Sequence, residues 1–200
     1  MDPLQQYLPK KETPPQPNKE NFIVETIKFV VLALIIVLPI RYFVAQPFVV
    51  SGSSMDPTFQ NGQYLIVDEL SYRFKDPHRG DVVVFTPPVD ADKYYIKRII
   101  GLPGETVRVE GSDVVIKNKN HPDGFKLDQS YVAEPNEKID SISFTLLNDQ
   151  YFVMGDNRAA SSDSRVWGPI TKESIVGQPA ARLFPIQTLG VYPGKFPYTN

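Results

Sequence analysis

Three serines lie close together in a short stretch suited to a turn, residues 50–59, with the sequence VSGSSMDPTF. Gly52 lets the backbone adopt an unusual dihedral or approach a ligand closely, and Pro57 excludes a continuing helix. A serine on such a turn can present its hydroxyl and its own backbone N–H together, and an acyl-transfer nucleophile needs both groups. The residues alone leave two interpretations open, a nucleophile or a polar linker turn, and an isolated serine-rich turn is more often a linker.

A lysine stands inside an apolar run at residues 94–104, with the sequence YYIKRIIGLPG, which is typical of a strand that ends in a turn. Alternation along a strand places Lys97 toward the core or a site, or else on the wet face with Arg98 inward. A lysine becomes a general base only if its pKa falls from about 10.4 by roughly 2–3 units, and desolvation can cause such a shift. Neighbours such as Tyr95 and Ile96 are suited to excluding water, but on the residues alone the solvent-facing interpretation is favoured.

A polar loop with several charged side chains follows an expected strand at residues 154–168, with the sequence MGDNRAASSDSRVWG. Its acids and arginines could pair with one another or form a solvated face. The three stretches contain, in chain order, the motifs Ser-Met-x-Pro-Thr, Tyr-x-Lys-Arg and Gly-Asp-Asn-Arg…Ser-x-Asp-Ser-Arg. Each motif alone is a weak signal, whereas three in order behind an apolar segment are a strong one.

In these motifs and their order the chain resembles the bacterial-type (type I) signal peptidases, which are membrane-bound Ser–Lys proteases that remove signal peptides. The resemblance extends over residues 22–184. It implies that Ser54 is the nucleophile, because the family's catalytic serine precedes a methionine, and it leaves Ser51 and Ser53 as rival positions. It implies in the same way that Lys97 is the general base.

The resemblance also implies which groups support Ser54 and Lys97, the proposed catalytic dyad. The backbone N–H of Ser54 would form the oxyanion hole, and some members add a serine hydroxyl two positions earlier, where this chain has Gly52. Ser161 stands where the family places a serine that holds the lysine amine, and Ser162 and Ser164 are its rivals. The residues expected to brace the loop as ion pairs are Arg79, Arg98, Asp156, Asp163 and Arg165.

Small apolar pockets beside the dyad are a further implication, and they would accept alanine at the −1 and −3 positions of the substrate. The substrate would lie extended and pair its backbone with a strand of the site. Ala159 and Ala160 depart from the family, which often has polar residues there, and this puts the hydrogen bonds of the loop in doubt. The residues that match the pocket, with ordinary core positions as the alternative interpretation, are Phe48, Val50, Met55, Phe59, Tyr95 and Ile96.

Composition excludes several other chemistries. The chain has no cysteine, which rules out a cysteine nucleophile, a disulfide framework and a thiolate zinc site. His78 and His121 are the only histidines, so a Ser–His pair must use one of them, and both lie in turn-forming segments without metal-ligand spacing. We therefore expect no metal and no cofactor. A net charge of −2 argues against a nucleic-acid partner.

An apolar segment precedes the serine turn. Its uncharged part is twelve residues long, and Lys28 and Arg41 at its edges can snorkel, so that a span within residues 22–45 could cross a bilayer. Four lysines precede the segment and only Arg41 closely follows it, which predicts a cytoplasmic N-terminus. Cleavage after Ala45 would place the bulky Phe43 at the −3 position, so we expect an uncleaved anchor.

The remaining pattern predicts a mainly β catalytic domain, a coiled antiparallel sheet or barrel, behind one transmembrane helix. Residues 1–21 form a polar tail that we expect to be disordered, residues 46–187 the peptidase domain, and residues 188–200 a C-terminal tail without an evident role. Within the domain, residues 118–138 are expected to be a surface loop or small insertion. The expected strands are 48–51, 63–68, 81–86, 94–102, 106–110, 113–118, 143–146, 150–155 and 175–184, with single helical turns at 71–74 and 171–174.

As partners the resemblance implies preprotein signal peptides and a lipid bilayer, and it implies a single-pass protein of the bacterial cell membrane, or of a thylakoid membrane, with an extracytoplasmic catalytic domain. A self-cleaving repressor-type protease shares the Ser–Lys pair, but this chain has an apolar segment where such a protein has a DNA-binding domain. A membrane-tethered β-rich binding module without an active dyad is the alternative from another class. A peptide-cleavage assay separates the binding module from the enzymes.

Overall fold

The computed structural model describes residues 19–43, 45–133 and 141–198, and within the N-terminal helix it describes the side chains of residues 22–38. The chain divides into two compact units, Met1–Ile40 and Arg41–Asn200.

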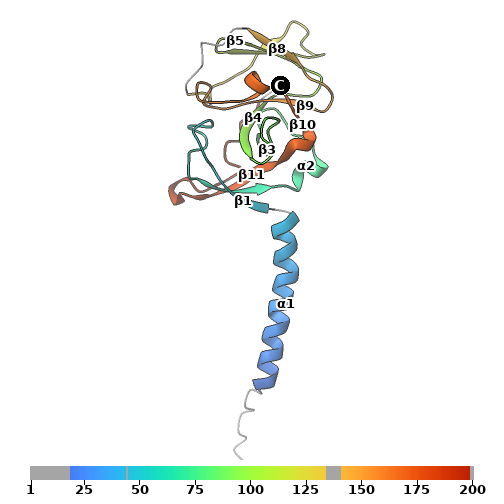
Figure 1. The fold of residues 1–200 in the computed structure, drawn as a ribbon, viewed down its shortest axis with the longest axis vertical. Helices are drawn as coiled ribbons and strands as arrows, with labels where there is room; N and C mark the ends of the chain where they lie inside the picture. The colour runs from blue at the N-terminus through green and yellow to red at the C-terminus, as the bar shows by residue number, and fades with distance from the viewer. Residues whose placement is uncertain (1–18, 44, 134–140, 199–200) are drawn as a thin grey trace, which may run out of the picture. The chain divides into compact units, whose positions relative to one another are not determined.

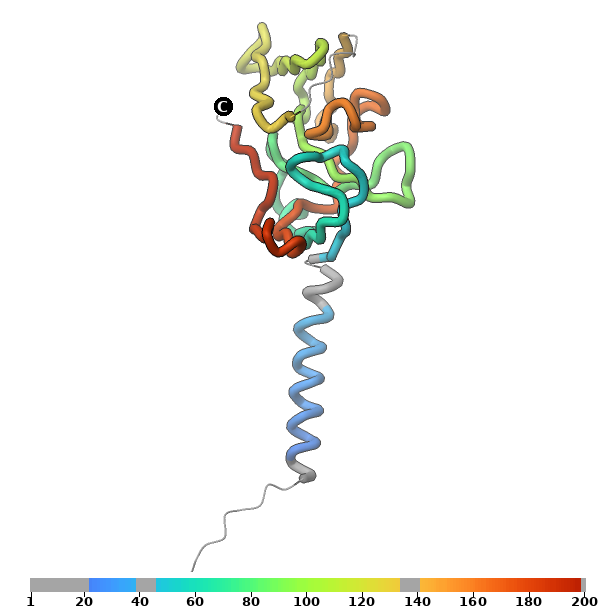
Figure 2. Tube along the Cα trace, turned by 90° about the vertical axis from the view of Figure 1, so that its left-hand side faces the viewer, coloured from blue at the N-terminus to red at the C-terminus, as the bar shows by residue number. Residues whose placement is uncertain are grey.

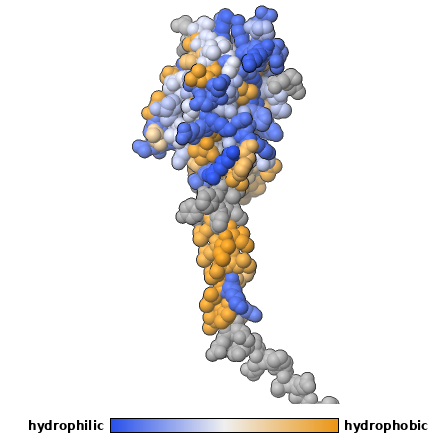
Figure 3. Space-filling model, turned by 90° about the vertical axis from the view of Figure 1, so that its right-hand side faces the viewer, coloured by the Kyte–Doolittle hydropathy of each residue, from blue (hydrophilic) through white to orange (hydrophobic). Residues whose placement is uncertain are grey.

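The first unit contains most of helix α1, which spans Lys19–Phe43. The helix begins three residues before the expected apolar segment, so the end of the polar tail is helical, while the rest of that tail and Val44 lie outside the described residues. Large apolar side chains between Phe22 and Leu38 are exposed, and the face of α1 seen in Figure 3 is mostly apolar. Among the described residues, no helix combines the length and the apolar character of a membrane span.

The second unit is mainly β, as the sequence predicts, and its described residues form two antiparallel sheets. The larger sheet has eight strands in the order β1-β2-β11-β3-β4-β9-β10, with β12 paired to β11. The smaller sheet has four strands in the order β7-β6-β5-β8 and lies at the opposite end of this unit from β1 (Figure 1). The strands are β1 Ala45–Val49, β2 Tyr64–Asp68, β3 Val82–Phe85, β4 Tyr95–Gly101, β5 Thr106–Glu110, β6 Asp113–Lys117, β7 Phe125–Lys126, β8 Ile142–Thr145, β9 Gln150–Met154, β10 Ile170–Thr171, β11 Ile175–Phe184 and β12 Gly190–Val191.

All nine expected strands are present, and two of them, β5 and β11, have the expected bounds. The sequence does not predict β7, β10 and β12, because each is two residues long and too short to show alternation. The excursion at residues 118–138 contains β7, and its last part, residues 134–138, lies outside the described residues.

Short helices connect the strands. Helix α2, Ser71–Phe74, and the 3₁₀ helix η2, Lys172–Ser174, occupy positions where the sequence predicts single helical turns. A further 3₁₀ helix, η3, spans Ile186–Thr188. Helix α3, Ser164–Trp167, is not predicted, and Asp163 caps it by accepting a hydrogen bond from the backbone N–H at position 165.

Three clusters of buried apolar side chains stabilise the second unit. One of them joins the small sheet to β9 through residues such as Val107, Ile116 and Phe152. Another contains Met55 and Phe59, which belong to the serine turn itself. Burial of a side chain of this size contributes roughly 1.5–3 kcal/mol, so these two residues fix the turn to the larger sheet.

Candidate active site

The serine turn and strand β4 bring a hydroxyl and an amine together. Lys97 lies on β4, which pairs with β3 on one side and with β9 on the other. Its Nζ donates a hydrogen bond to Ser54 Oγ at 2.7 Å and another to the carbonyl oxygen of Ile96 at 3.0 Å. Among the serines of the turn, Ser54 is the one that makes this contact in the described structure, although 43 residues separate it from Lys97.

Burial changes the proton affinity of this lysine. The Lys97 residue is only 4% exposed, and the Tyr95 ring centre lies 5.3 Å from its Nζ. Burial lowers the pKa of the Lys97 amine to about 8, while the charges of Asp163 and Asp156 oppose the shift and that of Arg165 adds to it. At pH 8 about half of the molecules therefore carry a neutral amine, which can accept the serine proton across the same 2.7 Å contact.

The turn that carries Ser54 is anchored at several points. Met55 and Phe59 lie in the core, and the backbone N–H of Phe59 donates to the carbonyl oxygen of Met55 at 2.9 Å. The backbone N–H of Gly52 donates to Asn61 Oδ1 at 3.0 Å. Gly52 has a φ of 94°, a conformation that strains other residues. The backbone around the hydroxyl is therefore fixed before any substrate binds.

A cavity of about 480 Å³ opens beside the dyad. Met55 and Phe59, expected to contact substrate, do not line it, because the turn directs both side chains into the core. Tyr94 does line it and packs edge-on against Phe48 at a centroid distance of 5.3 Å. The expected residues that line the cavity are Phe48, Val50, Tyr95 and Ile96, and the lining residues that sequence reasoning missed include Lys93, Tyr94, Ala160 and Ser162.

The loop after β9 lies directly against the serine turn. A Cβ atom at Gly155 would lie 2.3 Å from Ser161 Oγ and 2.4 Å from the carbonyl oxygen of Ser54, so only glycine allows this approach. Ser161 Oγ donates to Asp163 Oδ2 at 2.6 Å, and in the described structure no hydrogen bond joins it to Lys97. The role of Ser161 in orienting the amine therefore stays a prediction, and the bond that Ser161 does make fixes the loop.

Two buried ion pairs brace the site. Asp163 and Arg165 contact each other at 2.8 Å, in the pairing that the sequence predicts. Arg98 donates to both oxygens of Asp156, at 2.8 and 2.6 Å, and Thr58 Oγ1 donates to Asp156 Oδ2 at 2.6 Å. Separating a buried bidentate pair would leave an uncompensated charge, so such pairs hold their geometry. Through Thr58, the second pair is joined to the serine turn.

Arg79 does not join these pairs, which corrects the expectation from the sequence. It lies in a turn before β3, pairs with Glu105 at 2.6 Å and donates to the carbonyl oxygen of Ile100 at 2.5 Å. Its partners lie on β4 and in the turn after it, so Arg79 braces that turn. The loop that carries Asp163 is hydrogen-bonded at one of its two alanines, because the backbone N–H of Ala160 donates to Asn157 Oδ1 at 3.1 Å.

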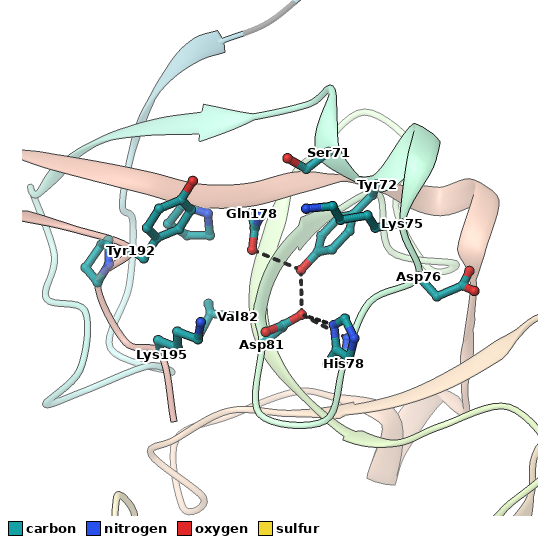
Figure 4. A pocket seen from close by; sticks show the side chains of 12 residues that line it. Ser71, Tyr72, Lys75, Asp76, His78, Asp81, Val82, Gln178, Tyr192 and Lys195 are labelled. Carbon is teal, nitrogen blue, oxygen red and sulfur yellow. Dashed lines mark hydrogen bonds and ion pairs between the residues drawn. The ribbon is translucent and has the colours of Figure 1, made fainter. Parts of the chain in front are cut away.

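Both histidines are exposed, and neither contacts the dyad. His78 lines a separate cavity of about 260 Å³, where its backbone N–H donates to Asp81 Oδ2 at 2.8 Å. Figure 4 shows the Tyr72 hydroxyl donating to the same carboxylate, at 3.0 Å. The residues around this second cavity are all different from those around the first. In the described structure Lys97, and neither histidine, contacts Ser54.

Comparison with known proteins gives a consistent result. Residues 23–184 match the family described as signal peptidase, peptidase S26. A probable signal peptidase I-2 from Synechocystis is 40% identical over 188 residues, which cover 91% of this chain and 81% of that protein. A signal peptidase I from Bacillus licheniformis is 34% identical over 185 residues, which cover 86% of this chain and 94% of that protein. A crystal structure of a signal peptidase I from Enterococcus faecalis, 30% identical, covers 52% of this chain and 97% of that chain with a TM-score of 0.44.

The family match spans most of the chain. Both relatives are more than 30% identical to it, over 81% and 94% of their own length. The chain therefore belongs to the signal peptidase family, peptidase S26, and is a serine peptidase.

Proposed function

We propose that this protein removes N-terminal signal peptides from exported preproteins, with Ser54 as the nucleophile and Lys97 as the general base. The observation that supports the proposal best is the buried amine, whose Nζ lies 2.7 Å from Ser54 Oγ and whose pKa burial lowers to about 8. An ordinary lysine at pH 7 is neutral in only a few molecules in ten thousand. A lysine with a pKa near 8 is neutral often enough to take a proton at each turnover.

In the proposed mechanism, neutral Lys97 takes the hydroxyl proton of Ser54 while Oγ attacks the scissile carbonyl carbon. The tetrahedral intermediate collapses, the C–N bond breaks, and the lysine ammonium returns its proton to the leaving amine. Lys97 then takes a proton from the water that attacks the acyl-enzyme, and it returns this proton to Ser54 Oγ as the ester bond breaks and the acid product leaves. The amine thus acts in both half-reactions.

A negative charge that forms on the substrate oxygen needs a hydrogen-bond donor, and a backbone N–H of the serine turn fits that role. The backbone N–H of Ser54 donates to no other group in the described structure and is free to bind the oxyanion. Gly52, where some family members have serine, has no hydroxyl, and its backbone N–H is already bonded to Asn61 Oδ1 at 3.0 Å. We therefore propose Ser54 N–H as the oxyanion donor.

The preference for small residues at the −1 and −3 positions is supported by the apolar lining of the cavity. Phe48 and Tyr94 close one side of it with their edge-to-face rings, and Ile96 stands next to the base. Strand β1 is the terminal strand of the larger sheet, so one edge is open for an extended peptide to pair with. Small side chains would enter the cavity while the peptide backbone pairs with the strand.

The proposed activity is tested with the purified full chain, detergent and a preprotein that has alanine at the −1 and −3 positions. We expect a single cut after the −1 alanine, identified by the masses of both products. Replacement of the −1 alanine by a bulky residue such as tryptophan is expected to prevent that cut, because a large side chain beside the dyad would hold the scissile carbonyl away from Ser54 Oγ. A protein that binds the preprotein but leaves it intact would be the β-rich binding module. A protein that cuts only itself would be the repressor-type protease.

We also propose that the segment within residues 22–45 anchors the protein in the bacterial cell membrane or a thylakoid membrane, with the N-terminus in the cytoplasm and the catalytic domain outside. The support is the exposed apolar surface between Phe22 and Leu38 and the lysines that precede it. Protease added to spheroplasts should digest an epitope placed after Asn200 and should spare one placed before Met1. Protection of the C-terminal epitope, with loss of the N-terminal one, would contradict this orientation.

A further inference from the structure

The chain continues past the region that matches the family, which ends at residue 184. We call residues 192–198 the strap; it consists of a turn at residues 192–194 and a stretch without regular secondary structure at residues 195–198. It follows β12, and the backbone N–H of Tyr192 donates to the carbonyl oxygen of Ala180 at 2.8 Å. Figure 2 shows the strap in red as it runs along one side of the second unit. From residue 194 onward the residues alternate in exposure: Gly194, Phe196 and Tyr198 are partly buried, while Lys195 and Pro197 are exposed.

The strap contributes a hydrogen bond to the buried Arg98. The Nη1 of Arg98 donates to the carbonyl oxygen of Gly194 at 2.6 Å and to that of Gly80 at 2.7 Å, while Nε and Nη2 bind Asp156. Arg98 is only 1% exposed, so a partner lost on one side is not replaced by bulk water without opening the structure. The carbonyl of Gly194 therefore completes the hydrogen bonding of Arg98, whose ion pair with Asp156 is joined to the serine turn.

The strap also lies directly against the serine turn and against the turn before β3. A Cβ atom at Gly194 would lie 2.7 Å from the ring of Phe59 and 2.9 Å from the methyl group of Thr58. A Cβ atom at Gly80 would lie 2.3 Å from the carbonyl oxygen of Phe196. These approaches leave no room for water between the strap and the two turns. Movement of the strap would therefore free Thr58, which holds Asp156, and Phe59, which anchors the nucleophile's turn.

A third set of contacts ties the strap to the loop before residue 134. The Tyr198 hydroxyl lies 2.9 Å from that of Tyr131, and the ring of Phe196 packs edge-on against both tyrosine rings at centroid distances of 4.9 Å. The Arg98 guanidinium stacks over the Tyr131 ring at 4.3 Å. The rings at positions 196 and 198 thus hold Tyr131 over the guanidinium and cover the ion pair from that side.

We propose that the strap is a positioning element for the catalytic dyad. The strap accepts a hydrogen bond from Arg98, which is paired with Asp156, and it packs against Thr58 and Phe59. These contacts hold the serine turn in position beside β4, so that Ser54 Oγ stays within hydrogen-bond distance of Lys97 Nζ. The inference rests on the proposed function, because its effect on turnover is read through Ser54 and Lys97. The strap itself touches neither the cavity beside the dyad nor the reacting atoms.

The alternation along the strap provides a matched pair of variants of the full chain. One variant, Phe196→Ala with Tyr198→Ala, removes the two inward rings; the other, Lys195→Ala with Pro197→Ala, changes the two exposed positions. Lys195 lines the second cavity (Figure 4), which shares no lining residue with the cavity beside the dyad. At a temperature well below the unfolding transition of both variants, kcat and KM are measured with the same preprotein, and the pKa of Lys97 is measured by NMR of labelled lysine without substrate.

We expect the inward variant to lower kcat at least tenfold with less than a twofold change in KM, and the outward variant to stay within twofold of wild type in both. The pKa of Lys97 should rise in the inward variant, because water reaches the amine and Asp156 is less well neutralised by Arg98. Asp163, Arg165 and Tyr95 also face this amine, and neither variant changes them. Tyr198→Phe, which removes one hydroxyl and keeps the ring, should fall between wild type and the inward variant.

A lower melting temperature with unchanged kcat and unchanged Lys97 pKa would show that the strap only adds stability, and equal losses in the inward and outward variants would also overturn the proposal. If the inward variant does not fold, the same measurements on Tyr198→Phe decide the question. The lysine titration needs no substrate. A wild-type protein that fails to cleave would therefore count against the proposed function, whereas an unmoved titration would count against the strap.

Discussion

Lys97→Arg and Lys97→Met are both expected to abolish preprotein cleavage, with a loss on the order of 10⁴-fold or more. Arginine keeps a positive charge in the same place, but its guanidinium stays protonated in proteins, so almost no molecule carries the neutral base that the mechanism needs. Methionine keeps the apolar stem in the buried environment of β4 and removes the amine. The rate constant is measured with purified full-length variants, and circular dichroism verifies that each variant is folded.

The histidines provide the matched control for the lysine. His78→Ala combined with His121→Ala should leave turnover within about twofold of wild type, because both side chains are exposed and neither contacts Ser54. In the wild-type protein kcat/KM should rise with pH through about 8, where the buried amine loses its proton. At pH 6 only about one molecule in a hundred would hold a neutral amine, and the rate should fall accordingly. Substantial turnover by Lys97→Arg would mean that the lysine serves only as a charge, and the dyad mechanism would have to be abandoned.

Ser54→Ala is expected to cause a loss of similar size, on the order of 10⁴–10⁶-fold, the range seen when members of a serine protease's catalytic group are removed. The substitution deletes one hydroxyl, while Met55, Phe59 and the Gly52–Asn61 hydrogen bond still hold the turn. Expression and membrane insertion should therefore be unchanged. Release of mature protein from a labelled precursor measures the loss.

Ser53→Ala is the control for the nucleophile, because it makes the same chemical change one residue away. Ser53 lines the cavity but has no hydrogen bond to Lys97 in the described structure, so this variant should keep much of the activity. An active Ser54→Ala together with an inactive Ser53→Ala would show that the nucleophile is the neighbouring serine.

The dyad could be predicted from the sequence only through the resemblance to a known family, because on the residues alone a linker turn and a solvent-facing lysine are the favoured interpretations. Each short motif fixes a residue type within a turn or strand, and a β-rich domain follows from alternation and turn residues over many segments. The contact of Ser54 with Lys97 agrees with that prediction. Burial is the main cause of the low pKa of Lys97, and the alternation of the strand alone left that burial open.

The sequence could not predict features that depend on the direction of a side chain in a turn or on how distant segments meet in the sheet. Met55 and Phe59 are apolar residues next to a serine, and only the path of the turn decides that they enter the core and not the cavity. The pairing of Arg79 with Glu105 depends on how two turns meet across the sheet, 26 residues apart in sequence. Gly194 acts through a backbone carbonyl, which every residue possesses, so no side-chain pattern could indicate its contact with Arg98.

The catalytic centre joins parts of the chain that are distant in sequence, and this has a consequence for biosynthesis. The Ser54–Lys97 contact spans 43 residues, and the Thr58–Asp156 bond spans 98. Such non-local contacts form late in folding, because closing long loops costs entropy before the contacts are made. A nascent chain that has formed only its early strands therefore has an exposed lysine, fully protonated, and an unactivated serine. Proteolytic activity is therefore expected to begin only when the sheet is complete, so that folding itself delays the activity during synthesis.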